Sequence, residues 1–77
     1  MECEMNEIFT IRAQVIQVMN CHLCVCDLST RQTILVNWPC SCHFRVGDYV
    51  CIEYDGMMTR SQPPQITASN VYCMHNH

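Results

Sequence analysis

The chain has 77 residues, of which 14% are charged, and its formal net charge is −3, with four arginines and no lysine. A chain of this length forms one domain with one modest core, which leaves little room for the walled pocket of an enzyme. The negative charge also excludes the basic surface that neutralises phosphates, so the composition argues against catalysis and against nucleic-acid binding.

The composition also predicts where the protein acts. The N-terminal segment is acidic, whereas a secretory signal begins with a basic region followed by an uninterrupted apolar stretch. No apolar run approaches the roughly 18 residues of a membrane span. We therefore expect a soluble cytoplasmic protein with reduced thiols and no membrane partner.

The segment from Ile8 to Met19 predicts a long first strand. Apolar and polar residues alternate up to Val15, which is the pattern of a half-buried β-strand. The alternation then slips, so that Ile16 and Val18 become the apolar pair around Gln17. Such a slip is typical of a β-bulge, which lets a strand curl around a small barrel.

A hairpin is predicted next. Residues His22–Leu28 and Gln32–Asn37 are two strand-like runs, and the polar residues 29–31 between them suit a turn. The segment 38–43 then breaks the pattern, because Pro39 cannot donate to a strand ladder. We expect a connecting loop there.

Two further strands complete the prediction. In residues 49–54 the apolar side chains of Val50, Ile52 and Tyr54 alternate with Cys51 and Glu53. The Asp-Gly pair at 55–56 ends that strand, residues 60–64 form a stiff segment, and strand character resumes from 65 to 74. Since no segment has a helical apolar period, the sequence predicts an all-β fold, a small five-stranded OB-like barrel. We expect one domain over residues 1–77, with short flexible tails at about 1–6 and 74–77.

The C-terminal part of the chain resembles the YobA-like family, small OB-like proteins of Gram-positive bacteria with no assigned function. The similar pattern runs from Phe44 to Val71: a Val46-Gly47-Asp48 turn into a strand, an Asp-Gly end, and a Ser-x-Pro-x-Gln segment before the last strand. The resemblance implies the fold rather than an activity. Members of that family are often exported and are not rich in cysteine, so the resemblance leaves the thiols of this chain unexplained.

Cysteine and histidine form the unusual feature of the sequence, with eight and four residues respectively. They cluster at 21–26, 40–43 and 73–77, and thiolates together with imidazoles suit Zn²⁺ or Cu⁺. A C-x-x-C pair can bind zinc where the backbone turns, and a second pair would complete a Cys₄ site. The predicted metal ligands are Cys21, Cys24, Cys40 and Cys42, with Cys26 and His43 as alternates.

Other interpretations of the thiols stay open. Cysteine is a small, readily buried residue that replaces valine or alanine in strands, and in an exported protein the thiols would form disulfides. Cys21 and Cys24 have no helix N-terminus to activate them for redox catalysis. We therefore expect a non-catalytic binding module, which holds zinc or Cu(I) through clustered cysteines. The alternative is a metal-free domain with cysteines in its core that binds an unidentified protein or small ligand.

Overall fold

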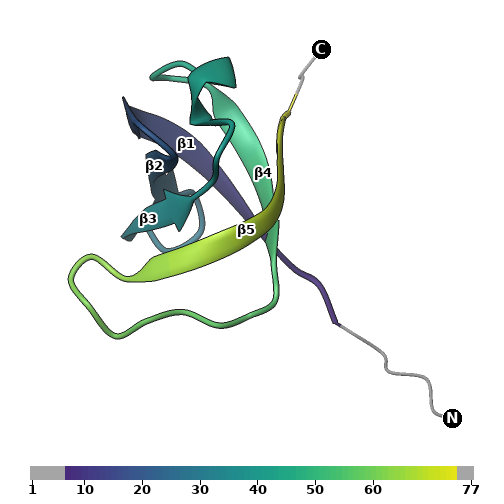
Figure 1. The fold of residues 1–77 in the computed structure, drawn as a ribbon. Helices are drawn as coiled ribbons and strands as arrows, with labels where there is room; N and C mark the ends of the chain where they lie inside the picture. Colours follow the sequence, from purple (N-terminus) through teal and green to yellow (C-terminus); the bar gives the residue numbers. More distant parts are fainter. Residues whose placement is uncertain (1–6, 75–77) are drawn as a thin grey trace, which may run out of the picture.

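A computed structural model describes residues 7–74 of the chain. Five strands and one 3₁₀-helix, η1, follow one another along the chain (Figure 1). Their bounds are β1 Phe9–Met19, β2 His22–Asp27, β3 Thr33–Asn37, η1 Ser41–His43, β4 Tyr49–Tyr54 and β5 Gln65–Cys73. The strand predictions are confirmed, and the connection expected at 38–43 contains only the short η1.

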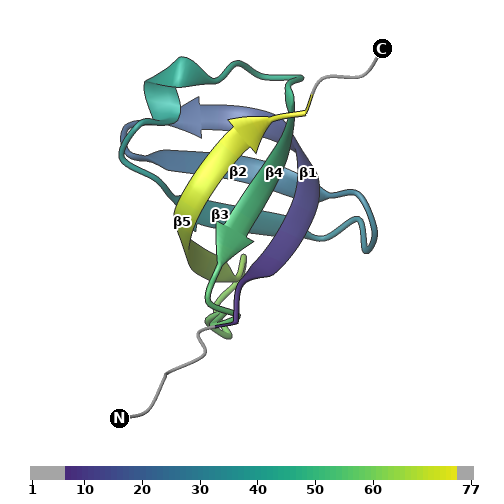
Figure 2. The same cartoon turned by 90° about the vertical axis from the view of Figure 1, so that its right-hand side faces the viewer.

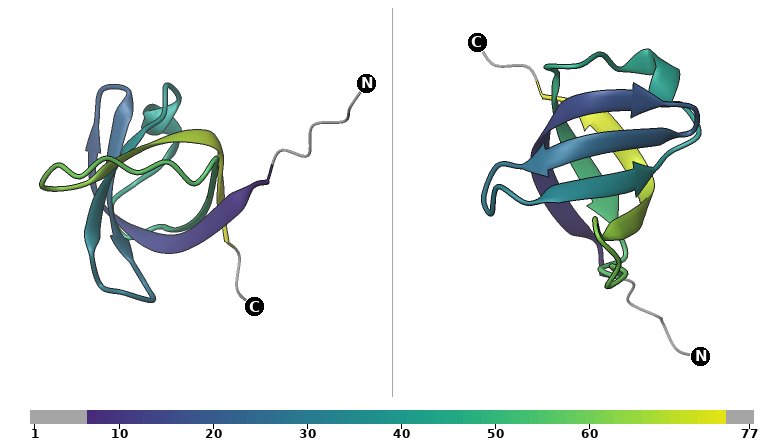
Figure 3. Two further views of the ribbon diagram at one scale, coloured as in Figure 1. Left: turned by 90° about the horizontal axis from the view of Figure 1, so that it is seen from below. Right: turned by 90° about the vertical axis from the view of Figure 1, so that its left-hand side faces the viewer.

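The strands close into a barrel in the order β1-β2-β3-β5-β4 (Figure 2). The long β1 bends, so that residues 9–14 pair antiparallel with β4 and residues 13–19 pair antiparallel with β2 (Figure 3). The strands β3 and β5 pair in parallel. This is the architecture of a small OB-like barrel, so the predicted all-β fold class is confirmed.

The bend of β1 coincides with a bulge at the predicted place. The register with β2 shifts between Val15 and Gln17, and the Val15 amide donates instead to the Asp48 carbonyl at 2.8 Å. Ile16 is the extra residue, and its side chain is 43% exposed. The expectation that Ile16 and Val18 form one apolar pair is therefore wrong, because only Val18 packs against the core.

The turn of the β2–β3 hairpin is held by the side chain of Asp27. One carboxylate oxygen accepts the amide hydrogens of Ser29 and Thr30, at 2.8 and 3.3 Å. Arg31 adopts a left-handed conformation with φ of 64° and donates its amide to the Asp27 carbonyl. The polar composition predicted for this turn thus acts through local hydrogen bonds.

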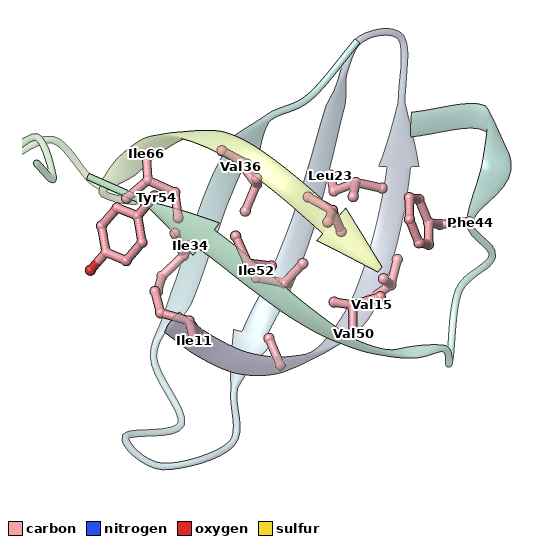
Figure 4. Close-up of a cluster of buried hydrophobic side chains, with 14 residues drawn as sticks. Ile11, Val15, Leu23, Ile34, Val36, Phe44, Val50, Ile52, Tyr54 and Ile66 are labelled. Carbon is pink, nitrogen blue, oxygen red and sulfur yellow. The ribbon is translucent and has the colours of Figure 1, made fainter. Parts of the chain in front are cut away.

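The core fills the barrel with branched aliphatic side chains (Figure 4). It runs from Tyr54 and Ile66 at one end, past the fully buried Ile52, to Phe44 at the other. None of the described cysteines belongs to this cluster, although Cys73 packs against it from the rim.

Within residues 7–74, no helix is long and apolar enough to cross a membrane. Met74 follows β5 and donates its amide to the Tyr49 carbonyl at 2.9 Å. The tails were predicted at about 1–6 and 74–77; apart from Met74, these segments, with Cys3, His75 and His77, lie outside the described residues.

Candidate functional site

The cysteines of the described chain lie on the outside or at the rim of the barrel. All seven are free thiols, and their exposure falls into three classes. Exposed are Cys21, Cys40 and Cys42; half-buried are Cys24, Cys26 and Cys73; buried is Cys51. Packing in the barrel interior therefore does not explain the three exposed cysteines, whereas Cys73 packs against the core cluster and Cys51 is buried.

Two of the predicted metal ligands, Cys24 and Cys26, lie on the outer face of β2. Their neighbours Leu23 and Val25 point inward and are fully buried, so the alternation of the strand turns the two thiols outward. The register places Cys24 between Gln17 and Leu35. Partial burial also raises the pKa of the Cys24 thiol, which disfavours the thiolate that a metal requires.

The register places Cys26 between Gln14 and Thr33, and its thiol donates weakly to the Asp27 carbonyl at 3.8 Å. Neither this cysteine nor Cys24 faces another predicted ligand across the strands.

The remaining predicted ligands belong to the β1–β2 turn and to η1 with its N-cap. These two segments lie at the same end of the barrel (Figures 2 and 3). Cys21 lies in the β1–β2 turn with φ of 59°, and its carbonyl accepts the Trp38 amide at 3.0 Å. Ser41 is 3% exposed, and its hydroxyl donates to the Met19 carbonyl at 2.6 Å. These two hydrogen bonds join the end of β1 and the β1–β2 turn to the segment 38–43. We therefore call Cys21, Cys40, Cys42 and His43 the thiol end of the barrel.

Replacing Ser41 with alanine is expected to lower the free energy of unfolding by about 1–3 kcal/mol, because the Met19 carbonyl loses its partner. Urea denaturation measures the loss. Ser69→Ala is the matched control: its hydroxyl also donates to a carbonyl, that of Glu53, but at an exposed position. Ser69→Ala should lower the free energy of unfolding by no more than about 0.5 kcal/mol. Equal losses of stability in the two variants would contradict the role of Ser41.

The geometry does not bring the predicted ligands into one coordination sphere. Among residues 7–74, no group of three or more His, Cys, Asp or Glu side chains is placed to hold a metal ion. A tetrahedral site needs sulfurs that converge on one point at about 2.3 Å. The predicted Cys₄ set is instead divided between the thiol end and the outer face of β2.

His22, which sequence reasoning left out of the ligand set, adjoins the thiol end. Its Nδ1 lies 2.9 Å from the Asn20 carbonyl, a contact that favours the tautomer with a proton on Nδ1. The Nε2 lone pair is then available, which is the arrangement in which histidine binds metals.

Cys51 is buried on the outside of the barrel rather than in its core. It shares a row with Arg12 of β1 and Tyr72 of β5, and its side chain is 8% exposed. The expectation that Cys51 shares a face with Glu53 is confirmed, yet its neighbours cover it. The Cys51 thiol is the main cause that raises the pKa of Tyr72 to about 12, and the Glu53 carboxylate adds to it.

The raised pKa of Tyr72 predicts that the stability of the fold depends on pH in the alkaline range. The folded state holds the Tyr72 proton more tightly than the unfolded chain, so its contribution to stability is present below pH 10 and is lost as the pH rises through about 12. Absorbance of tyrosinate should show a late-titrating phenol, and Tyr72→Phe should remove this late component. Cys51→Ala should shift that titration toward the ordinary tyrosine value, and an unchanged titration would contradict the assignment.

A trough runs along β5 on the surface of the barrel. Three hollows of about 780, 310 and 650 Å³ adjoin one another. The first two share Asp55 and Thr67, and the last two share Met58 and Thr59. We call this chain of hollows, which is lined by residues 7–9, 32–33, 37, 55, 57–69, the β5 trough.

One wall of the trough is the β4–β5 loop, which runs beside the first half of β5 (Figures 1 and 3). Thr59 ties the loop to the strand, because its hydroxyl accepts the Gln65 amide at 2.9 Å and its amide donates to the Gln65 carbonyl at 3.0 Å. Asp55 accepts the Met57 amide at 2.9 Å and so shapes the start of the loop. These bonds hold the wall in place.

The sequence predicted parts of the trough but did not indicate that they lie together at one site. The Asp-Gly pair that starts the loop and its stiff proline segment were both predicted, and the loop between them carries Met57 and Met58, which are 73% and 37% exposed. What was missed is that Phe9 and Asn37, which are far away in sequence, line the same trough. An exposed apolar pair beside turn residues was the available signal.

No family model matches the chain, and neither the curated proteins nor the solved structures include a match. The resemblance to the YobA-like family therefore stays a prediction.

Proposed function

We propose that the chain is a non-catalytic binding module whose ligand, a protein segment or a small molecule, lies in the β5 trough. The observation that supports this most directly is the continuity of the three hollows, each within the size range of ligand sites. We place the protein in a reducing compartment, the cytoplasm, since its described cysteines are free.

The residues of the trough suit binding rather than chemistry. Among the residues that the structure describes, its lining contains no histidine or cysteine, and the charged groups there are Glu7, Asp55 and Arg60. Asp55 already uses one oxygen on the loop backbone. One arginine and one aromatic ring, that of Phe9, also offer little for a nucleic-acid strand, which needs several cations and stacking platforms.

A screen of small-molecule fragments and short peptides by amide NMR tests the proposal. Binders should shift the amide signals of Asp55–Ser69, and Thr67→Trp, which fills the trough, should abolish the shifts. Asn70→Trp is the control, because Asn70 is exposed on the same strand but lines none of the hollows. If all shifts centre elsewhere, or if both variants bind equally well, the proposal is wrong.

A second candidate function is the binding of a soft metal ion, Zn²⁺ or Cu⁺, at the thiol end. It is supported by three exposed thiols on two segments that hydrogen bonds hold together, with the Nε2 of His22 nearby. Because the side chains do not converge as they stand, binding would have to draw Cys21 toward Cys40 or Cys42. This candidate site does not include Cys24 and Cys26, because both lie on the outer face of β2.

Elemental analysis of protein purified without chelator, followed by titration with Zn²⁺ and Cu⁺ under reducing conditions, tests this candidate. Bound metal should raise the melting temperature, and the double variant Cys40→Ser/Cys42→Ser should lose the effect. Cys24→Ser/Cys26→Ser is the matched control and should keep it. Absence of bound metal together with an unchanged melting temperature would contradict the candidate.

A further inference from the structure

The β5 trough has opposite charges at its two ends. Glu7 and Asp55 line the hollow beside Phe9, whereas Arg60 lines the hollow at the far end of the loop. The middle hollow, which contains Met57 and Met58, shares Asp55 with the acidic end and Met58 with the basic end. Along its length the trough therefore passes from acidic, through apolar, to basic.

The shape of the trough suits an extended chain. The hollows follow one another along β5 and open to solvent, so a compact molecule in any one of them would remain largely uncovered. A segment that lay along all three would cover the apolar surface of Phe9, Met57 and Met58, which are 47%, 73% and 37% exposed. Methionine side chains adapt to irregular apolar partners, which favours a peptide over a rigid ligand.

Polar groups that bind a peptide backbone line the same path. The Asn37 side-chain amide donates to the Thr67 hydroxyl at 3.3 Å, which leaves its carbonyl oxygen and one hydrogen free in the middle hollow. Gln65 lines this hollow as well. Amide side chains offer both a donor and an acceptor, and so match both groups of a peptide bond.

We infer that the β5 trough takes an extended peptide with a basic residue at the Glu7/Asp55 end, an apolar residue in the middle and an acidic residue at the Arg60 end. This inference rests on the proposed function, since it names the ligand of the same site. The charges orient the peptide, and the methionines accommodate its apolar side chain.

Three synthetic peptides of identical composition test the inference by amide NMR titration of the full chain. In the bipolar peptide lysines lie at one end, leucines in the middle and glutamates at the other; in the mixed peptide the charges alternate; the third peptide has leucines at both ends. The bipolar peptide should bind most tightly and shift the signals of residues 55–69. A nitroxide on its basic end should broaden the signals of Ile8 and Phe9, and one on its acidic end those of residues 60–62.

Charge-removing variants test the end assignment. Asp55→Asn keeps the oxygen that accepts the Met57 amide and removes only the charge. This variant and Arg60→Gln should each weaken binding of the bipolar peptide about two- to fivefold. Each should also reduce the preference of the protein for the bipolar over the mixed peptide. Glu53→Gln and Arg45→Gln, whose side chains lie outside the trough, are the matched controls and should bind as the wild type does.

Each outcome separates the inference from the proposed function. Equal binding of the three peptides, or a reversed pattern of nitroxide broadening, overturns the inference while shifts in the trough still support the function. If fragments shift the trough signals and no peptide does, the inference falls and the function stands. If nothing shifts those signals, both are wrong.

Discussion

Replacing Ile52 with alanine is expected to lower the free energy of unfolding by about 2–5 kcal/mol. Ile52 is fully buried at the centre of the core, and β4 pairs on both sides, with Ile11 and Val71 opposite this residue. The truncation leaves a cavity that strands paired on both sides cannot collapse to fill. In a domain of this size the loss is a large part of the total stability.

The matched control for Ile52→Ala is Ile16→Ala, which removes the same atoms from a side chain that is 43% exposed. We expect it to cost about 1 kcal/mol or less. Urea denaturation at a constant m-value measures the free energy of unfolding that each of the two variants loses. Similar losses would show that Ile16 packs in the barrel, which would contradict its position as the bulged residue of β1.

Replacing Gly56 with alanine is expected to destabilise the fold by about 2–4 kcal/mol through two separate effects. Gly56 has φ of 91°, a conformation that L-residues avoid. A Cβ atom there would also lie 2.7 Å from Cε1 of the Phe9 ring. The ring must move, and because Phe9 lines the β5 trough, ligand binding should weaken along with stability.

Two variants separate these effects. Gly47 has φ of 99°, but nothing lies within 4 Å of a Cβ added there, so Gly47→Ala measures backbone strain alone, about 1–2 kcal/mol. In the background Phe9→Ala, the Gly56→Ala change should cost no more than Gly47→Ala does. Additive losses in the Phe9→Ala/Gly56→Ala double variant would mean that the ring does not oppose the new methyl group.

The strands of this protein were predictable because each carries its own local pattern. Alternation in residues 49–54 placed Val50, Ile52 and Tyr54 inside the barrel, where the structure has them. The slip near Ile16 predicted the bulge, but not that Ile16 would be the residue pushed outward, since a bulge can extrude either neighbour. In the structure the register with β2 skips Ile16, and the Val15 amide bonds to Asp48 far along the chain.

The candidate sites depended more strongly on long-range contacts. Clustered thiols suggested one metal site, because residues close in sequence were assumed to converge. Strand geometry instead separates neighbours: Cys21 lies in a turn, whereas Cys24 is held on a regular strand with Gln17 and Leu35 at its sides. Spacing within a segment indicates the direction of a side chain but not which distant residue will face it.

By itself, the sequence determined the all-β class, the order and bounds of the strands and the turn chemistry, because alternation, glycine and proline act over a few neighbouring residues. Only the tertiary structure decided which outward-facing side chains meet. Closure of the barrel brings Phe9, Asn37 and the β4–β5 loop to one trough and leaves the described thiols outside the central cluster of core side chains, with Cys73 packed against it. Register and closure are set by pairing between strands distant in the chain, and no local pattern encodes them.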